Sequence, residues 1–462
     1  MAQFSSHTFK CQWKTAIRSI MFYQVLTLET TSCGPAFYNK VRIYSHDFLK
    51  ACVYIAGFDS QSKIFTKKLY SRLVATSHLL EDFLDLHGAK NNKQWFFFRE
   101  LASTVRHLSS SGYSQRHISN RMMFYDLFDT GNFKEEGEKT LVFITESLMK
   151  VAPVVIEEAK RLNIEIPQGS YDQANFPGVV TGEMLEYDID DDDMVVEQKL
   201  HVVKIASDFL NIVKTFEPLS FYEPYTQAEI VSIVPSKVSE VEIRGFEMQI
   251  HNLQSSFDSY VIIGGYRYGN RKLKQLRAHF SVVLHILEVQ GRLLHYYERH
   301  LLELGGISLY QQVRRRLCEL VDPKKLLDRT INYGLFYVSH FLNAGKKVAY
   351  QILDENIEKT SIRVGIPMTR GFHNRPSMMV AKIVQHFGGK VEMIVNGDRF
   401  DASSVLDIQW AGGKIQKENV TEVIFEGDAR ALNDIKILAS VNYAEDFMGK
   451  GLSLPKELVY LK

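Results

Sequence analysis

The chain has 462 residues, of which 45% are hydrophobic and 24% are charged, and its formal net charge is +1. These proportions are typical of a globular protein. The length favours two to four domains, with hydrophobic cores large enough to be stable without disulfides or structural metal ions. A net charge so close to zero provides no global field that would steer the protein toward nucleic acid, so we expect no nucleic-acid partner.

The four cysteines are widely spaced and include no C-x-x-C pair, which predicts neither a zinc site nor a disulfide framework. The N-terminal stretch has basic residues but no clean apolar segment followed by a small-residue cleavage site. The most apolar stretch, residues 141–156, is interrupted by Glu146 and Lys150. We therefore expect a cytoplasmic protein in a reducing compartment, with no membrane insertion and no bound cofactor or metal.

Residues 1–165 are predicted to form a helical domain. Apolar residues recur at helical spacing through residues 73–88 and 95–112, and both segments end in glycine. A further helix or helix pair is predicted over residues 138–162, where Pro153 indicates a break or a kink. Aromatic clusters in this region are interpreted as core.

Residues 166–200 are rich in Gly, Pro and Asp and are predicted to be an acidic linker. The run Asp190–Asp193 could coordinate a cation, but it lacks the glycine and the distal glutamate of the twelve-residue calcium loop. A solvated linker is the favoured interpretation.

Residues 201–355 form a second predicted helical region. One amphipathic helix is expected over residues 198–217, and the longest periodic pattern of the chain runs from Leu276 to Leu304. That pattern is compatible with a coiled-coil seam between two copies, although packing within the chain is favoured. The glycine-rich residues 264–272 match no phosphate-binding fingerprint and are interpreted as a turn.

The last hundred residues change character. Alternating apolar residues predict a strand at 362–366, and an apolar stripe after His373 predicts a helix that ends at Gly388. Two short strands joined by Asn-Gly-Asp predict a hairpin. A short helix over 403–413, a strand and a final helix capped by Asp428 complete the order β-α-β-β-α-β-α. This unit is predicted to span 356–445, with 446–462 as a C-terminal extension.

Two motifs in this unit resemble the HPr family, the histidine phosphocarrier domains of the bacterial sugar phosphotransferase system. The first is Gly371-Phe372-His373-Asn374-Arg375-Pro376-Ser377, and the second is Ser404 followed by aliphatic residues and ending near Ala411-Gly412. The resemblance covers under a fifth of the chain. It implies an open-faced β-sandwich, a four-stranded antiparallel sheet with three helices, and hence an α+β fold for the whole chain.

The resemblance also implies roles for single residues. His373 would accept phosphate from enzyme I and pass it to a sugar-specific acceptor protein, and Arg375 would bind the phosphate. Ser404 would be a regulatory site for HPr kinase, with plain helix capping as the alternative. The bulkier Phe372 and Asn374, and Ser403 in place of a basic or amide residue, depart from the family pattern and bear on partner identity.

Physical chemistry favours this placement of a phosphate-accepting histidine. A neutral imidazole is a nucleophile near pH 7, and a helix N-terminus stabilises the negative charges that it would gain. Pro376 is expected at the first helical position, which biases Arg375 away from helix and leaves His373 just outside the helix. Arg375 is expected to be an exposed, always-charged donor.

Two other functions stay open at this point. Some 360 residues precede the phosphocarrier-like unit, so the chain could instead be a regulatory or scaffold protein that uses this unit to sense phosphorylation or to dock a partner. An enzyme active site in the helical part lacks any recognisable catalytic motif. His295 and Glu298 are interpreted as ordinary bundle residues.

Overall fold

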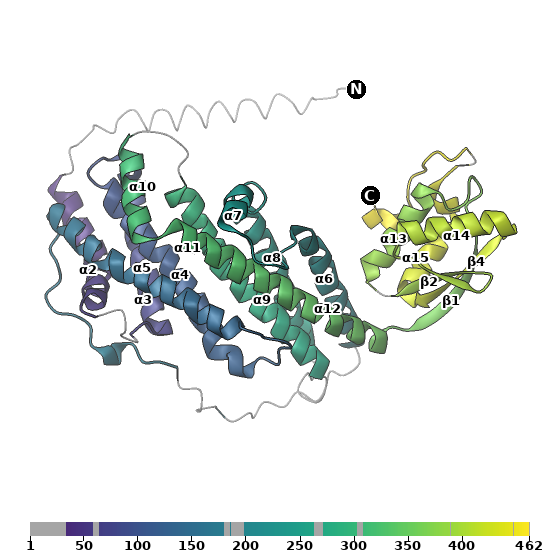
Figure 1. Cartoon of the computed structure of the whole chain (residues 1–462), viewed down its shortest axis with the longest axis horizontal. Coiled ribbons are helices and arrows are strands. Elements are labelled where there is room, and N and C mark those ends of the chain that lie inside the picture. Colours follow the sequence, from purple (N-terminus) through teal and green to yellow (C-terminus); the bar gives the residue numbers. More distant parts are fainter. Residues whose placement is uncertain are drawn as a thin grey trace, which may run out of the picture.

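The computed structural model describes residues 34–58, 64–179, 185, 198–262, 271–302, 308–388, 390–446 and 448–461. The described part is mostly helical and contains one small four-stranded antiparallel sheet, so the α+β class is confirmed at that level. The helices form an elongated bundle, and the sheet with its own helices forms a unit at one end of that bundle (Figure 1). The acidic run Asp190–Asp193 and the glycine-rich stretch 264–270 lie outside the described residues.

The bundle is built from long helices with apolar stripes. Their bounds are α2 (Pro35–Ala56), α3 (Lys67–Leu86), α4 (Phe96–Arg121), α5 (Phe133–Arg161), α6 (Gln198–Phe216), α7 (Gln227–Ile233), α8 (Glu240–Phe257), α9 (Arg271–Tyr296), α10 (Ser308–Leu320), α11 (Pro323–Asp328) and α12 (Phe336–Asn356). Helix α4 packs against α3, α5 and α9, and α9 packs against α8 and α12. Buried side chains from both helical segments of the sequence belong to one hydrophobic core.

Helix α9 carries the long periodic pattern that the sequence indicated. It continues into a π-helical turn, η7 (Tyr297–Leu301). The apolar residues of the pattern, from Leu276 to Leu301, are buried inside the bundle, so packing within the chain is confirmed for them. Of the break or kink expected at Pro153, the break is wrong, because α5 runs through that residue as one helix.

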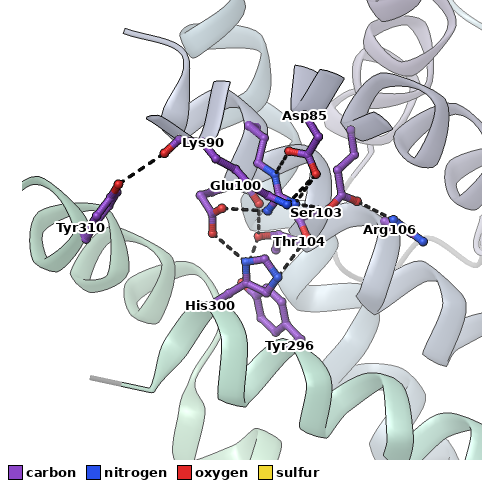
Figure 2. Close-up of polar contacts among 11 residues, drawn as sticks. Asp85, Lys90, Glu100, Ser103, Thr104, Arg106, Tyr296, His300 and Tyr310 are labelled. Atoms are coloured by element: carbon purple, nitrogen blue, oxygen red, sulfur yellow. Dashed lines mark hydrogen bonds and ion pairs between the residues drawn. The ribbon is translucent and has the colours of Figure 1, made fainter. Parts of the chain in front are cut away.

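Charged side chains are buried where α3, α4 and η7 meet. The Arg99 guanidinium donates to Glu81 at 2.7 Å and to Asp85 at 2.8 Å, and it also donates to Glu100 at 2.9 Å. Glu100 in turn lies 2.6 Å from His300 (Figure 2). Each buried charge thus has a partner of opposite sign or a hydrogen bond, which is the condition under which burial of charges is tolerated.

The C-terminal unit has the predicted element order. Its elements are β1 (Lys359–Gly365), α13 (Asn374–Phe387), β2 (Val391–Val395), β3 (Asp398–Asp401), α14 (Val405–Glu418), β4 (Glu422–Asp428) and α15 (Ala429–Ser440). The strand order is β1-β4-β2-β3, and every neighbouring pair is antiparallel. Alternate residues of β2, Val391, Met393 and Val395, are buried in the same core as the three helices, whereas Glu392 is exposed. One face of the sheet is therefore covered by helices.

Two local details of this unit can be compared with the sequence. The predicted hairpin between β2 and β3 is confirmed, with Asn396 at φ 47° and Gly397 at φ 92° in its turn. The predicted end of the second helix near Gly412 is wrong, because α14 continues to Glu418. A Cβ on Gly412 would lie 3.1 Å from the carbonyl oxygen of Phe372, so this glycine serves close packing and not termination.

The last residues pack onto the unit and do not extend away from it. Leu458 and Leu461 are buried in its core, and Lys382 donates to the carbonyl oxygen of Leu461 at 3.1 Å. Tyr460 stacks on the ring of His386 with a centroid separation of 4.0 Å. The segment from residue 442 onward consequently lies against α13 and α15.

Within the part of the chain that the structure describes, no helix combines the length and the apolar character needed to span a bilayer.

The bundle and the C-terminal unit touch where α6 meets the end of α13. There the Ser207 hydroxyl donates to the carbonyl oxygen of Phe387 at 2.6 Å, and the side chain of Leu210 lies beside Gly388.

Candidate functional site

His373 is held just outside the start of α13. Arg370 and Gly371 both adopt left-handed backbone conformations, with φ 60° and 58°, which turn the chain into the helix. His373 is the N-cap residue with extended backbone, and its carbonyl oxygen accepts the first helical bond from Ser377 N at 3.2 Å. The Ser377 hydroxyl donates to the carbonyl oxygen of Phe372 at 3.0 Å, which fixes the turn. The expected position of His373 is confirmed.

The expected role of Pro376 is wrong in detail. The helix begins at Asn374, so Pro376 occupies the third helical position and Arg375 the second. Proline is accommodated there because the first N–H groups of a helix have no intrahelical partner in any case. Arg375 is consequently helical, and it is half-buried instead of exposed.

The guanidinium of Arg375 faces the C-terminal segment. A Cβ added to Gly451 would lie 1.9 Å from Nη2 and 2.1 Å from Nη1 of Arg375, so the absence of a side chain at residue 451 leaves room for the guanidinium. The Nε atom of Arg375 is buried and has no hydrogen-bond partner among the described residues. This arginine therefore has a buried donor without an acceptor, close to Gly451.

Glu445 pairs with His373. Its Oε2 atom lies 3.1 Å from Nε2 of His373, and its side chain is fully buried, whereas about a third of the His373 side chain is exposed (32%). An ionised carboxylate only accepts hydrogen bonds, so Nε2 carries the proton in this contact and Nδ1 holds the lone pair. The other oxygen, Oε1, is buried without a partner among the described residues.

A strained turn delivers Glu445 to this position. Asn442, Tyr443 and Ala444 all have left-handed backbones, with φ 51°, 56° and 58°. Such conformations cost on the order of 1–3 kcal/mol each for non-glycine residues, so neighbouring contacts must enforce them. The Tyr443 hydroxyl donates to the carbonyl oxygen of Gly365 at 2.7 Å, and burial raises the pKa of that hydroxyl, which keeps it a donor.

Glu445 was missed by the sequence analysis, which placed it at the very end of the phosphocarrier-like unit. It is 72 residues away from His373 in sequence, and no motif or periodicity connects the two. The only local signal is the Asn-Tyr-Ala-Glu stretch after the last helix, where asparagine tolerates a left-handed backbone.

Ser404 is the N-cap of α14. Its hydroxyl accepts from the backbone N–H of Asp407 at 3.2 Å, and the residue is half-buried. Helix α14 lies next to the start of α13, where Gln409 donates to Asn374 at 3.5 Å. The Gln385 side chain, near the end of α13, donates to the carbonyl oxygen of Ser403 at 2.7 Å, so Ser404 lies beside the end of α13 opposite His373. The structure accounts for Ser404 as a cap.

Two large apolar side chains are exposed on α14. Leu406 is 61% exposed and Trp410 is 68% exposed, and residues four apart lie on the same face of a helix. Exposed apolar groups of this size next to a polar site are a common feature of protein–protein contact surfaces.

The arrangement can bind an anion at His373. Unpaired N–H groups at the start of α13 and the positive end of its dipole favour negative charge there, whereas the Glu445 carboxylate, 3.1 Å from Nε2, opposes it. Among the described residues, the cluster whose side chains could hold a metal ion lies in the bundle and does not include His373.

Comparisons of the chain with family models, with curated proteins and with solved structures found no match.

Proposed function

We propose that the chain is a cytoplasmic phosphocarrier of a phosphoenolpyruvate-dependent sugar phosphotransferase system. His373 accepts a phosphoryl group from an enzyme I-like protein and passes it to an acceptor protein. The observation that carries this proposal is the position of His373 at the N-cap of α13, with Nε2 bound to Glu445 and Nδ1 left as the nucleophile.

The transfer would proceed by in-line displacement. The lone pair of His373 Nδ1 attacks the phosphorus atom of a phosphohistidine on the donor, and the donor's P–N bond breaks as the new P–N bond forms. The donor imidazole leaves with the bonding electron pair. The same step in the opposite sense hands the phosphoryl group to the acceptor, so no oxidant, reductant or metal takes part.

Glu445 and Arg375 would have separate tasks in this step. Glu445 holds the Nε2 proton, and it stabilises the imidazolium character that develops as Nδ1 forms its bond to phosphorus. Arg375 can offer its donors to the phosphoryl oxygens. The element order and the four-stranded antiparallel sheet with three helices support this proposal, because the resemblance to the HPr family implies both.

Partner docking would use the exposed face of α14. Leu406 and Trp410 offer an apolar contact beside the start of α13. A phosphate added to Ser404 by an HPr kinase-like enzyme would place charge beside this surface and would change docking, because a phosphate both replaces the hydroxyl cap and repels acidic groups.

A regulatory binding module is the second candidate. Gly451 lies beside the guanidinium of Arg375, and Nε2 of His373 lies 3.1 Å from Glu445. These contacts of Arg375 and His373 with the C-terminal segment suit a unit that binds a partner protein according to whether His373 is phosphorylated. In this alternative, label enters His373 but reaches no acceptor protein.

The deciding experiment uses the full-length chain with enzyme I and labelled phosphoenolpyruvate. We expect acid-labile label on the wild type and on His386→Ala, a control at the exposed far end of the same helix, and none on His373→Ala. Phosphoramidate serves as a small donor in a parallel reaction, so that failure of one donor protein to dock is recognised. Label absent from the wild type with both donors, or equal in His373→Ala, would contradict the proposal.

A further inference from the structure

Three histidines converge in the bundle, far from His373 in the sequence. His107 comes from α4, His295 from the end of α9 and His300 from the π-helical turn η7. One ring nitrogen of each lies within 4.8 Å of one ring nitrogen of each of the others. His107 and His300 are buried, at 3% and 6% exposure, and His295 is half-buried.

The π-helical turn is the reason that His300 belongs to this group. Residues five apart in an α-helix point roughly 140° away from each other around the axis. A π-turn closes its hydrogen bonds over five residues, so residues five apart return to nearly the same face. The rings of His295 and His300 consequently lie 6.0 Å apart between centroids. Such turns are rare and are frequent at functional sites.

Two of the three rings are already oriented by carboxylates. Nδ1 of His300 lies 2.6 Å from Glu100, and Nδ1 of His295 lies 2.8 Å from Glu240. A carboxylate on one ring nitrogen fixes the tautomer and leaves the lone pair on the other, which is the usual arrangement of histidines that bind metal ions. Nε2 of His300 lies 3.1 Å from the hydroxyl of Ser103, which would turn away when that nitrogen binds an ion (Figure 2).

The third ring lacks the partner that its burial calls for. Nδ1 of His107 is buried and has no hydrogen-bond partner among the described residues. An unsatisfied buried polar atom costs about 1–3 kcal/mol, so such an atom needs an explanation. The His107 ring stacks on His295 with a centroid separation of 4.4 Å. Burial, together with nearby His300, lowers the pKa of His107 well below its ordinary value, so the ring is neutral and able to donate a lone pair.

We propose that His107, His295 and His300 bind one divalent transition-metal ion, with Glu100 and Glu240 as the carboxylates that orient two of the ligands. Three imidazole nitrogens suit zinc and its neighbours in the first transition row, and they do not suit calcium or magnesium, which prefer oxygen ligands. Three protein ligands leave a coordination position for water or for a small ligand.

The two orienting carboxylates also pair with arginines. Glu100 lies between His300 and Arg99, which it meets at 2.9 Å, and Arg99 is shared with Glu81 and Asp85. Glu240 contacts His295 and also pairs with Arg244 at 2.8 Å and with Arg299 at 3.7 Å. The rings of His107 and His295 stack with an interplanar angle of 28°, and a ring-nitrogen lone pair lies in the ring plane, so one of these rings must rotate before both can bind the same ion.

The test uses the full-length protein, stripped with a chelator and then titrated with Zn²⁺ or with Co²⁺ as a spectroscopic probe. We expect about one ion per chain after gel filtration and a cobalt absorption band from imidazole ligands. His107→Gln and His295→Gln should abolish stoichiometric retention of the metal ion. His285→Gln should keep it; this control histidine lies on α9 and contacts α4, but it is not part of the cluster. His295 is half-buried, so its variant decides the matter if His107→Gln does not fold.

A fourth variant separates a metal site from a merely structural cluster. Glu240→Gln should keep one ion per chain but weaken its binding ten- to a hundredfold, as removal of an orienting carboxylate usually does. Zn²⁺ should also raise the thermal midpoint of the wild type and not that of His295→Gln. A wild type that retains no ion, or retention that is unchanged in both histidine variants, would overturn the proposal.

Discussion

The Nε2 atom of His373 lies 3.1 Å from the buried carboxylate of Glu445, a residue that the chain reaches only after completing the whole β-sheet. This contact fixes which ring nitrogen carries the proton. It also makes the C-terminal segment part of the candidate site, because the strained turn at residues 442–444 leads directly into Glu445.

Glu445→Gln tests this contact directly. A glutamine keeps the size of the side chain but removes the charge that favours protonated Nε2, and a hydrogen bond to a charged group contributes about 1.5–3 kcal/mol. We expect the tautomer preference of His373 to weaken, which ¹⁵N chemical shifts of the ring report. We also expect phosphorylation of His373 to slow by about tenfold or more. An unchanged tautomer in Glu445→Gln would show that the carboxylate does not orient the ring.

Gly451→Ala should displace the guanidinium of Arg375 without unfolding the unit. The three atoms nearest to the added Cβ all belong to the flexible end of the arginine, and Nη2 is 1.9 Å away. We expect a transfer rate ten- to a hundredfold lower, comparable to that of Arg375→Ala, because a charge-assisted bond to phosphate is lost in both. Gly413→Ala is the matched control, since a Cβ there meets nothing within 4 Å. Equal rates for Gly451→Ala and Gly413→Ala would contradict a role for the guanidinium.

Trp410→Ala tests the proposed docking face. Trp410 is 68% exposed, so its removal should leave the thermal midpoint nearly unchanged. If the donor protein contacts α14, we expect KM for that donor to rise about tenfold with little change in kcat, because tryptophan is a common anchor of protein interfaces. Val459→Ala, at an exposed apolar residue on the C-terminal segment, is the control. Identical KM values for the two variants would exclude this face.

Gly427→Ala should destabilise the sheet strongly. Gly427 has φ 149°, and a Cβ there would lie 2.2 Å from the carbonyl oxygen of Lys390, which is backbone and cannot rotate away. We expect a loss of about 2 kcal/mol or more in the free energy of unfolding, measured by urea denaturation. Gly365→Ala is the control. Gly365 is the last residue of the neighbouring strand β1, a Cβ there has open space around it, and the substitution should change stability by less than about 1 kcal/mol.

The buried histidines predict an acid-sensitive bundle. Burial lowers the pKa of His107 well below its usual value and that of His117 to about 4. Histidines of the unfolded chain titrate near 6.5, so below that pH the unfolded state binds protons that the folded state does not. The free energy of unfolding should therefore fall as the pH drops from about 6.5, and it should be independent of these groups above that pH.

Urea unfolding between pH 5 and 7.5, with a chelator present, measures this slope. His107→Gln should reduce it by up to about 1.4 kcal/mol per pH unit, with a remainder from His117 and other buried groups. His46→Gln is the control, because that side chain is 56% exposed. A slope that is the same in His107→Gln and in the wild type would contradict the assignment of a neutral His107.

Periodicity predicted helices α3, α4, α5, α6 and α9 of the bundle and the element order of the C-terminal unit, but it did not single out α2, α8 or α12. Apolar stripes and alternation report burial, and burial decides these elements. Local rules erred where tertiary contacts intervene. Gly412 did not end α14, because it provides room for Phe372, and Pro376 was two positions further into its helix than expected, because the whole first turn tolerates proline.

The site was predictable only in its local part. His373 and Arg375 sit two residues apart at a helix start, so a short motif could indicate them. Glu445 and the trio of His107, His295 and His300 come together through packing of distant segments and through a π-helical turn that leaves no periodic signature. Local patterns in a single sequence do not indicate which distant residues come into contact in the folded protein.

The hydrogen bond from Ser207 to the carbonyl oxygen of Phe387 has a consequence for any excised version of the C-terminal unit. Helix α13 has 14 residues and is about 21 Å long, with His373 at one end and the bundle at the other. Leu210 and Leu353 cover the glycine that terminates it. A fragment that starts after α12 would expose that glycine and leave the carbonyl oxygen to water, so the helix would fray from the end opposite the histidine. Phosphoryl-transfer rates measured on such a fragment would therefore report on a helix α13 that lacks its contacts with the bundle.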